Sequence, residues 1–260
     1  MTDSPALDWH QLRSETLLYE DEDVLVLDKP VGLSVVGERH DTDLVQLAKD
    51  AGEYINPAHR IDKVTSGVIA FAKSKEQHGF LTRQFAKRTV AKQYLAVVIG
   101  DTLPACRFTI DLGLRTASSG RVRIATPRSS IEWDQSRCTF FTNNPDKQHR
   151  SFPSTTVVEP ISSTNGTSVI SVNPLTGRRH QIRVHLAWIG FPVAGDPLFK
   201  STSGTGFGRT LLHSFRLAIK VPSSPDEPMV FEATPGPDFT SYEGAKGLAD
   251  SNIAELVQPT

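Results

Sequence analysis

The stretch HRIDKVTSGVIAFA, residues 59–72, joins an irregular polar segment to an apolar run. The run over 67–72 has the length and the β-branched and aromatic content of a buried strand. Asp62 lies shortly before that strand, between the cations Arg60 and Lys63. A carboxylate on a rigid element suits catalysis, and cationic neighbours favour its ionised, nucleophilic form. The spacing alone leaves a structural aspartate in a surface salt bridge as an equal alternative.

Short apolar runs and turn residues along the rest of the chain predict many short strands and few helices. Strands are expected at 24–27, 94–99, 155–158, 169–172, 211–219 and 229–232. Helices are expected at 44–49, at 75–88 behind a Ser74–Gln77 capping box, and at 178–189. This pattern predicts an α+β fold with a mixed, mainly antiparallel sheet core and flanking helices, rather than a doubly wound sheet.

Three segments differ in amino-acid composition from the rest of the chain. Residues 1–22 form an acidic N-terminal extension, and residues 240–260 form a polar C-terminal tail. Between 118 and 153 the sequence is rich in Ser, Thr, Arg, Asn and Pro and has little periodicity. We expect a long loop there, weakly ordered between 129 and 148, as an insertion at about 129–150. The remaining residues, 23–239, are expected to form one domain that contains this insertion.

The formal net charge is −1, but the charge is unevenly distributed. Residues 1–23 and residues 225–260 each contain seven acids and one base, a balance of −6 at each end. The residues between them therefore carry +11. A basic body is compatible with RNA binding, because affinity depends on the local field at the phosphates. A solvated basic surface is the ordinary alternative.

The number of cysteines and the length of the apolar runs indicate the cellular compartment of the protein. Cys106 and Cys138 are the only cysteines, too few for a disulfide framework, and they form no C-x-x-C pair. No apolar run approaches the length of a membrane span, and the N-terminus has no secretory signal. These features predict a cytoplasmic protein in a reducing compartment.

A second motif, TGRRHQIRVHL at 176–186, contains three arginines and two histidines within eight residues. Such a cluster at the start of a helix is typical of anion recognition. In the expected helix Arg179 and Arg183 lie on one stripe. His180 and His185 are five residues apart, which is not the spacing of a zinc-binding helix, and no acidic ligand is near. We therefore expect no metal site.

A third motif, KQYLA at 92–96, contains an aromatic residue directly after a basic helix end. Tyr94 in this setting could stack on a base. Taken alone, the ordinary role of a strand tyrosine in the core explains it better.

The motifs together resemble the RluA-type pseudouridine synthase family, over about 23–239. The matching segments, in order, are DKPVGLSV at 28–35, HRIDKVTSG at 59–67, KQYLA at 92–96, TGRRHQIRVHLAWIGFPVAGDPLF at 176–199, LLHSFRL at 211–217 and ATPGPDF at 233–239. The resemblance implies the pseudouridine synthase catalytic fold and isomerisation of uridine in tRNA or rRNA. It implies neither a cofactor nor a metal, and we expect a monomer with RNA as its partner and no membrane association.

The resemblance also implies roles for individual residues. Asp62 is the catalytic aspartate, Tyr94 packs against the uracil, and Arg183 ion-pairs with Asp62. Arg60 helps to displace the flipped base from the RNA stack. Further substrate-binding residues are expected at Arg178, Arg179, His180, Gln181, Val184 and Leu186. Ile61, Val64, Arg179 and the insertion depart from the family pattern, which leaves substrate choice open.

Other readings of the sequence remain. The chain could be a non-catalytic RNA-binding or assembly factor, although pure binding would not need a carboxylate near phosphates. A glycoside or nucleoside hydrolase would need a pair of carboxylates. Between 51 and 72 the acids are Glu53 and Asp62 alone, so no second catalytic carboxylate is evident. Carbon–nucleoside formation on a free nucleotide is a third alternative.

Overall fold

The computed structural model describes residues 8–37, 43–144, 150–164, 166–199 and 207–242. The chain divides into two compact units: unit 1 is Met1–Lys92 with Ser214–Thr234, and unit 2 is Gln93–His213 with Pro235–Thr260. Residues 23–239, expected as one domain, are thus shared between both units. The chain passes from one unit to the other within β5 (Ala91–Ile99), within β13 (Leu212–Val221) and again between Thr234 and Pro235.

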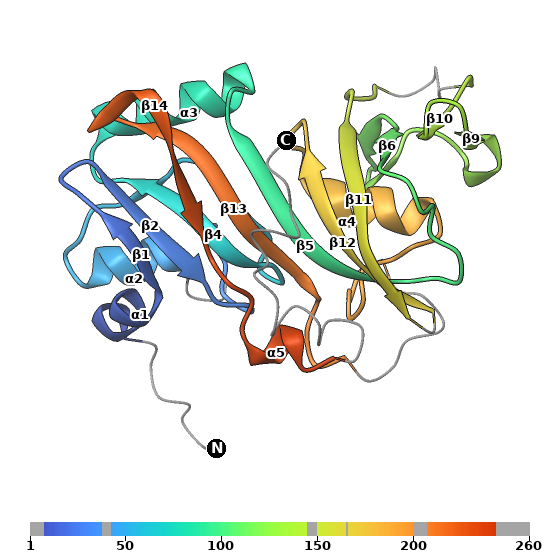
Figure 1. The fold of residues 1–260 in the computed structure, drawn as a ribbon. Coiled ribbons are helices and arrows are strands. Elements are labelled where there is room, and N and C mark those ends of the chain that lie inside the picture. The colour runs from blue at the N-terminus through green and yellow to red at the C-terminus, as the bar shows by residue number, and fades with distance from the viewer. Residues whose placement is uncertain (1–7, 38–42, 145–149, 165, 200–206, 243–260) are drawn as a thin grey trace. The chain divides into compact units, whose positions relative to one another are not determined.

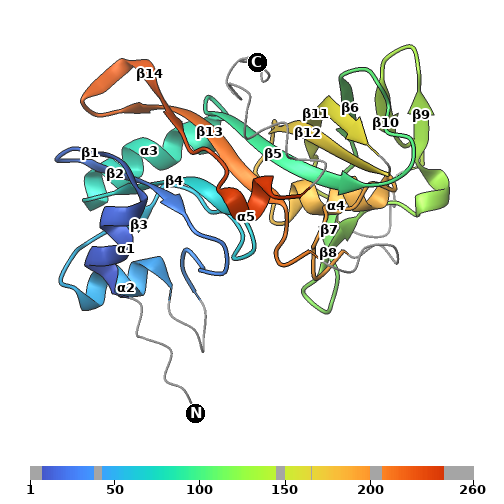
Figure 2. The ribbon, with the colours of Figure 1, turned by 60° about the horizontal axis from the view of Figure 1, so that its bottom comes forward.

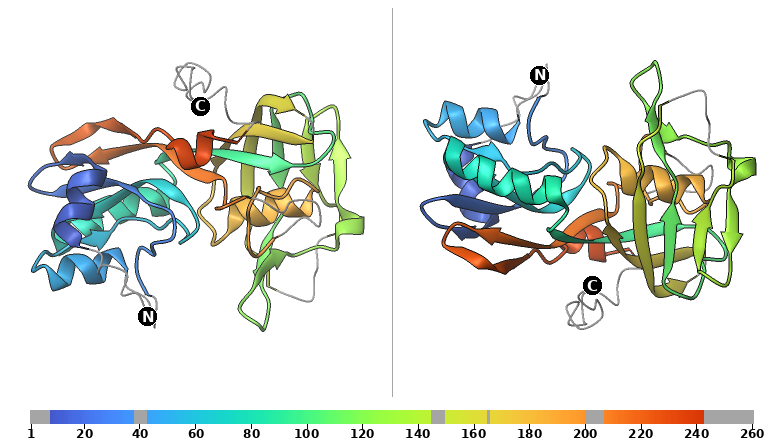
Figure 3. Two further views of the ribbon diagram at one scale, coloured as in Figure 1. Left: turned by 90° about the horizontal axis from the view of Figure 1, so that it is seen from below. Right: turned by 90° about the horizontal axis from the view of Figure 1, so that it is seen from above.

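Unit 1 is built on strands in the order β1-β2-β4-β13, with β14 paired to β13 and β3 paired to β4 (Figure 1). The bounds of its other strands are β1 Leu17–Glu20, β2 Val24–Lys29, β3 Asn56–Pro57, β4 Ser66–Ala72 and β14 Ser224–Glu232. Its helices are α1 Trp9–Thr16, α2 Leu44–Asp50 and α3 Lys75–Lys87. α1 packs on α2 and β2, and α3 packs on β3 and β4 (Figure 3).

The core of unit 1 follows from alternation along its strands. Val24 and Val26 of β2 lie opposite Ala72 and Ala70 of β4, and all four are buried. Side chains two apart on a strand share a face, so one apolar layer runs across these strands to Leu217, Ile219 and Val221 of β13. Every residue of β4 is buried, as its apolar run predicted.

The acidic extension expected at 1–22 needs a correction where the structure describes it, from residue 8 onward. α1 is capped by the Asp8 carboxylate, which accepts a hydrogen bond from the Gln11 amide at 2.8 Å. Trp9 and Leu12 are buried, and β1 pairs antiparallel with β2. Burial of these side chains makes the segment an integral part of unit 1 despite its negative charge.

Unit 2 contains a six-stranded run in the order β5-β12-β11-β6-β10-β9. The bounds are β6 Phe108–Asp111, β9 Glu132–Asp134, β10 Thr139–Phe141, β11 Thr155–Thr164 and β12 Thr167–Pro174. Its neighbouring strands are antiparallel, except that β10 runs parallel to β6. A separate pair is formed by β7 (Leu114–Thr116) and β8 (Val122–Ile124), as Figure 2 shows. Short helices follow at η1 Arg128–Ser130, α4 Gln181–Trp188 and α5 Pro237–Thr240.

The long loop expected over 118–153 is wrong in part. This segment contains β8, η1, β9 and β10, and its part at 145–149 lies outside the described residues. Phe108, Trp133 and Phe140 pack together there, with ring centroids 4.6–6.2 Å apart. These contacts join strands of only three or four residues, which are too short to show a period in the sequence.

The helix expected at 178–189 begins later, at Gln181. His180 precedes it in the left-handed conformation, with φ of 55°, which ends any helical path from residue 178. Arg179 therefore lies outside the helix, and the stripe that it was expected to share with Arg183 does not exist. α4 packs on β8, β11 and β12, and all its residues except Trp188 are buried.

Few helices around a mixed, mainly antiparallel sheet confirm the α+β prediction. None of the helices that the structure describes combines the length and the apolar character of a membrane-spanning segment.

Candidate active site

Asp62 lies on a tight turn that leads into β4. Its backbone carbonyl accepts a hydrogen bond from the Thr65 amide at 2.9 Å, and its side chain is half-buried. The Gly32 amide donates to the Lys63 carbonyl at 2.8 Å, so the turn is also joined to the segment after β2. The carboxylate thus projects from backbone that is fixed on two sides, as a nucleophile or a base requires.

Lys29 organises the segment that holds this turn. The residue is fully buried at the end of β2, and its ammonium donates to the carbonyls of Pro30 and Leu33 at 2.7 Å each. The Lys63 carbonyl lies farther from the same ammonium, at 3.5 Å. Buried cations persist only where such acceptors replace water. Lys29 lies in the segment DKPVGLSV at 28–35, from which no role for this residue was predicted.

The two residues at the start of the motif differ in their surroundings. His59 accepts a hydrogen bond from the Ala70 amide through Nε2 at 3.2 Å and stacks on Phe85, with ring centroids 4.8 Å apart. Loss of solvation, aided by the nearby Lys92 ammonium, lowers the pKa of His59 to about 3. His59 is therefore a neutral structural group at physiological pH. Arg60 beside it is exposed and available to a ligand.

Tyr94 is placed by the register of the unit 2 sheet. It lies opposite Val172, which lies opposite Val158, and paired residues of antiparallel strands share a face. The hydroxyl of Thr156, two residues before Val158, lies 2.9 Å from Nδ1 of His185 in α4, within hydrogen-bond distance. Tyr94 therefore projects to the face of its sheet that α4 covers, and it is 8% exposed.

Arg183 is held by an acidic residue that the sequence analysis did not single out. Its Nε and Nη2 donate to the two carboxylate oxygens of Asp196 at 2.6 and 2.8 Å, and both side chains are almost completely buried. The Asp196 carboxylate also accepts from the amides of Leu198 and Phe199 at 2.8 and 3.1 Å. The guanidinium is thereby fixed in position and orientation.

Gln181, the first residue of α4, has a structural role. Its amide oxygen accepts from the Thr176 hydroxyl at 2.6 Å and from the Arg178 amide at 3.0 Å. Its amide nitrogen donates to the Thr155 carbonyl and the Thr156 hydroxyl, both at 3.0 Å. The side chain is used within the protein, so its expected substrate contact is replaced by a role in positioning the loop before α4.

Several other residues of the motif at 176–186 are also buried. Val184 and Leu186 are fully buried, so neither presents surface to a ligand within unit 2. His185 Nε2 lies 2.9 Å from the Leu112 carbonyl, which can only accept, so Nε2 carries the proton and Nδ1 accepts from Thr156. Burial lowers the pKa of His185 to about 4.

The solvent-facing part of the motif is smaller than the sequence suggested. Arg178 and Arg179 are exposed, and His180 is half-buried with its ring 6.1 Å from that of Phe199. The guanidinium of Arg178 lies 5.3 Å from the ring of Phe152. A cation over an aromatic face keeps its outer side open to a further anion. These residues form the accessible cationic edge of unit 2 beside α4.

The expected site residues thus fall into two groups. Arg60 and Asp62 belong to unit 1, and all the others belong to unit 2. Lys29 and Asp196 hold the segments that carry the expected site residues, and neither was predicted from the sequence. The available signals were a lysine at the end of an apolar strand and the one acid of the segment 176–199.

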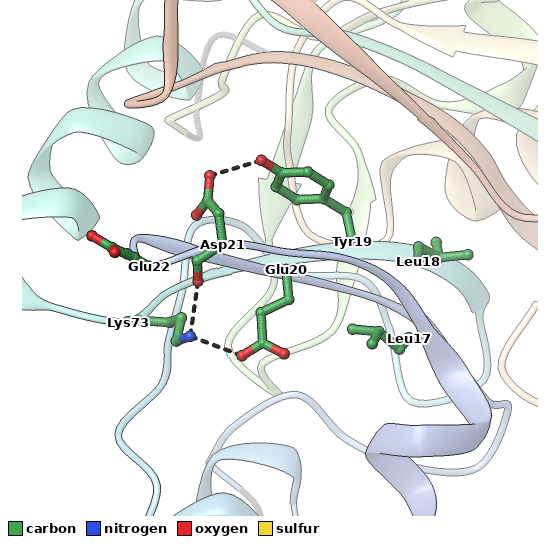
Figure 4. A pocket seen from close by; sticks show the side chains of 7 residues that line it. All are labelled: Leu17, Leu18, Tyr19, Glu20, Asp21, Glu22 and Lys73. Carbon is green, nitrogen blue, oxygen red and sulfur yellow. Dashed lines mark hydrogen bonds and ion pairs between the residues drawn. The ribbon is translucent and has the colours of Figure 1, made fainter.

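A depression in unit 1 is a different feature (Figure 4). It has a volume of about 770 Å³ and is lined by residues of β1, its following turn and Lys73. The Lys73 ammonium donates to the Glu20 carboxylate and to the Asp21 carbonyl, both at 2.8 Å. The Tyr19 hydroxyl donates to Asp21 at 2.8 Å. These hydrogen bonds join the polar groups of Tyr19, Glu20, Asp21 and Lys73 to one another.

Comparisons with known proteins bear on this arrangement. A family model described as RNA pseudouridylate synthase matches residues 23–188. The dual-specificity RNA pseudouridine synthase RluA of Escherichia coli K12 is 32% identical over 213 residues, which is 80% of this chain and 87% of that protein. The mitochondrial tRNA pseudouridine(32) synthase of Saccharomyces cerevisiae is 31% identical over 208 residues, or 78% of this chain.

The chain spans only 41% of the length of the yeast relative. Among solved structures, the human protein RNA Pseudouridylate Synthase Domain Containing 1 is similar, with a TM-score of 0.64 and 26% identity. That alignment covers 91% of this chain and 95% of the human chain.

Proposed function

Because this chain belongs to the RNA pseudouridylate synthase family, we propose that it isomerises uridine within RNA to pseudouridine. In this reaction the bond from C1′ of the ribose to N1 of the uracil breaks, and a bond from C1′ to C5 forms. The hydrogen of C5 is released to solvent, and N1 gains a proton. No electron is transferred and no group is imported, so the chemistry requires neither a cofactor nor a metal.

Asp62 is the group that performs this chemistry in the proposal. Its place in HRIDKVTSG, on a turn held by the DKPVG segment, is the observation that carries the assignment. Its carboxylate can add to the sugar, add to the base or remove a proton from the sugar, and each route frees the uracil to rotate. A nucleophile that moved with a loose loop would lose the alignment that each route needs.

Access to the uridine requires that the base leave its stack, at a cost of a few kcal/mol. Arg60 is exposed beside Asp62 and can fill the vacated space, which offsets part of that cost. Tyr94 packs against the flipped uracil in this proposal. Arg183 is the cation that keeps the catalytic carboxylate ionised, and Asp196 fixes the guanidinium for that purpose.

The RNA substrate in this proposal is a tRNA or an rRNA. The names of the relatives include a tRNA enzyme and a dual-specificity RNA enzyme. Arg178 and Arg179 supply exposed cations for the backbone phosphates. We expect the protein to act as a monomer in the cytoplasm, which fractionation of cells and light scattering of the purified chain would test.

The proposal is tested by release of tritium from RNA labelled at C5 of uridine, because isomerisation displaces that hydrogen. Total RNA from cells that lack the gene serves as substrate. The wild type should release tritium, whereas Asp62→Asn should release none while it keeps its fold and its RNA affinity. Release by Asp62→Asn would remove the aspartate from its role. Binding without release by the wild type would favour an RNA-binding factor, and release from free labelled uridine monophosphate alone would favour a nucleotide enzyme.

A further inference from the structure

The only two cysteines of the chain lie 32 positions apart in sequence but meet in unit 2. Their Sγ atoms are 2.8 Å apart. Cys106 is exposed and Cys138 is half-buried. The sequence alone gave no sign of this, because neither residue belongs to a motif of paired cysteines.

Backbone pairing brings the two residues together. Cys106 lies two residues before β6, and Cys138 lies immediately before β10. These strands are parallel neighbours with Thr109 opposite Thr139, and the Thr109 amide donates to the Cys138 carbonyl at 2.9 Å. The approach of the sulfurs is therefore fixed by hydrogen bonds that do not involve the thiols.

The turn before β10 directs the second thiol toward the first. Cys138 has φ of 46°, a left-handed conformation in which glycine or asparagine is usual. The Asp134 carboxylate holds this turn, because it accepts from the Ser136 and Arg137 amides at 2.9 and 3.1 Å. The left-handed backbone at Cys138 is explained by the contact that its side chain makes with Cys106.

We propose that Cys106 and Cys138 form a reversible disulfide when the protein meets hydrogen peroxide. A disulfide has an S–S distance of about 2.05 Å, so the thiols need to move by less than 1 Å. One thiolate attacks the peroxide oxygen, which gives a sulfenic acid and releases water. The other thiol then attacks that sulfur, forms the S–S bond and releases a second water molecule. The two sulfurs are oxidised by two electrons in total, and the peroxide is reduced by two.

The surroundings of Cys106 and Cys138 favour the reduced state, in which both side chains are thiols. The contact with Cys106, with some desolvation and the nearby Asp134 carboxylate, raises the pKa of the Cys138 thiol. A raised pKa lowers the fraction of thiolate and so slows the reaction of Cys138 with an oxidant. Exposure of Cys106 gives that oxidant access.

The bond would close a loop that contains β6, β7, β8, η1 and β9. Closure of a loop of this length restricts the unfolded chain and should raise the melting temperature by roughly 5–10 °C. It would also fasten β9 and β10 to the start of β6. The modification is independent of the proposed RNA chemistry, because neither cysteine belongs to the residues assigned to it.

The test uses the full-length chain, treated with hydrogen peroxide and with dithiothreitol as the reverse step. Oxidised wild type should lose both titratable thiols, lose about 2 Da of intact mass and stay monomeric. Its melting temperature should rise and return with dithiothreitol. Cys106→Ser and Cys138→Ser are matched variants, each with a single thiol, and neither should show the thermal shift. Two thiols that persist, a gain of oxygen to sulfinic acid, or a disulfide between two chains would each overturn the proposal.

Discussion

Arg183 and Asp196 form a bidentate ion pair within unit 2, with side-chain exposures of 2% and 0%. The carboxylate also caps the turn that follows it. One acidic residue therefore joins the orientation of a candidate catalytic arginine to the folding of the loop after α4. Both the stability of the protein and its catalytic activity should therefore depend on Asp196.

Asp196→Ala should strongly destabilise the protein, because it leaves a buried guanidinium without its carboxylate. Loss of one partner of a buried pair costs about 3–5 kcal/mol. The free energy of unfolding from urea titration measures this loss. Glu232→Ala is the matched control, since Glu232 pairs with Arg216 at the surface and should cost about 0–1 kcal/mol. Equal losses in the two variants would contradict the role of burial.

Gly195→Ala should destabilise the protein far more than Gly120→Ala, although the two glycines have a similar backbone conformation. Gly195 has φ of 71°, and a Cβ there would lie 1.9 Å from the Arg209 carbonyl oxygen. Gly120 has φ of 76° with no atom within 4 Å of the same position. Gly120→Ala should therefore cost only the strain of its conformation, about 1–2 kcal/mol. Urea midpoints that differ little between the two variants would exclude the clash.

Stability should fall on acidification through His185. Its pKa is lowered to about 4, so between that value and the ordinary value of 6.5 the unfolded chain binds the proton and the folded protein does not. Its contribution is complete above pH 6.5 and is lost as the pH falls toward 4, by about 3 kcal/mol in total. His185→Gln should flatten this part of the pH profile of unfolding.

The control for that experiment is His10→Gln, because His10 is exposed. The profile of this variant should follow the wild type. His59, whose pKa is lowered to about 3, acts in the same direction, so some slope should remain in His185→Gln. An unchanged slope in His185→Gln would show that other groups govern the acid sensitivity.

Arg178 and Arg179 should determine part of the salt dependence of RNA binding. Log affinity falls with log salt by roughly 0.7–0.9 per neutralised phosphate, so loss of both arginines should reduce the slope by roughly 1.4–1.8. Filter binding of tRNA at several salt concentrations measures it. Arg137→Ala is the control, because Arg137 already pairs with Asp134 at 3.0 Å. Affinity that is insensitive to salt and to both arginines would exclude RNA as the partner.

Arg60→Ala should impair activity most where the target uridine is stacked or paired. If the arginine fills the space of the flipped base, its loss should lower kcat/KM by about 10-fold on structured RNA and much less on an RNA with the uridine already unpaired. Single-turnover tritium release on both RNAs measures the ratio. Equal losses on the two substrates would assign Arg60 a general role in phosphate binding instead.

The sequence by itself determined the α+β class, most strands and the capped α3. The Ser74 cap, the buried run of β4 and the apolar run of β2 are signals that depend on residues close together in the chain. Such signals act locally, so they need no knowledge of the partner strand. Motif order likewise predicted the family before any geometry was known.

Tertiary structure alone decided which charged and polar side chains meet. Arg183 with Asp196, Lys29 with three carbonyls and Cys106 with Cys138 all join positions whose proximity depends on strand pairing or loop closure. The start of α4 was missed for the same reason, because the Gln181 side chain anchors the loop to β11 and His180 then turns left-handed. A polar side chain has the same appearance in sequence whether it faces a ligand or a buried partner, and only packing distinguishes the two.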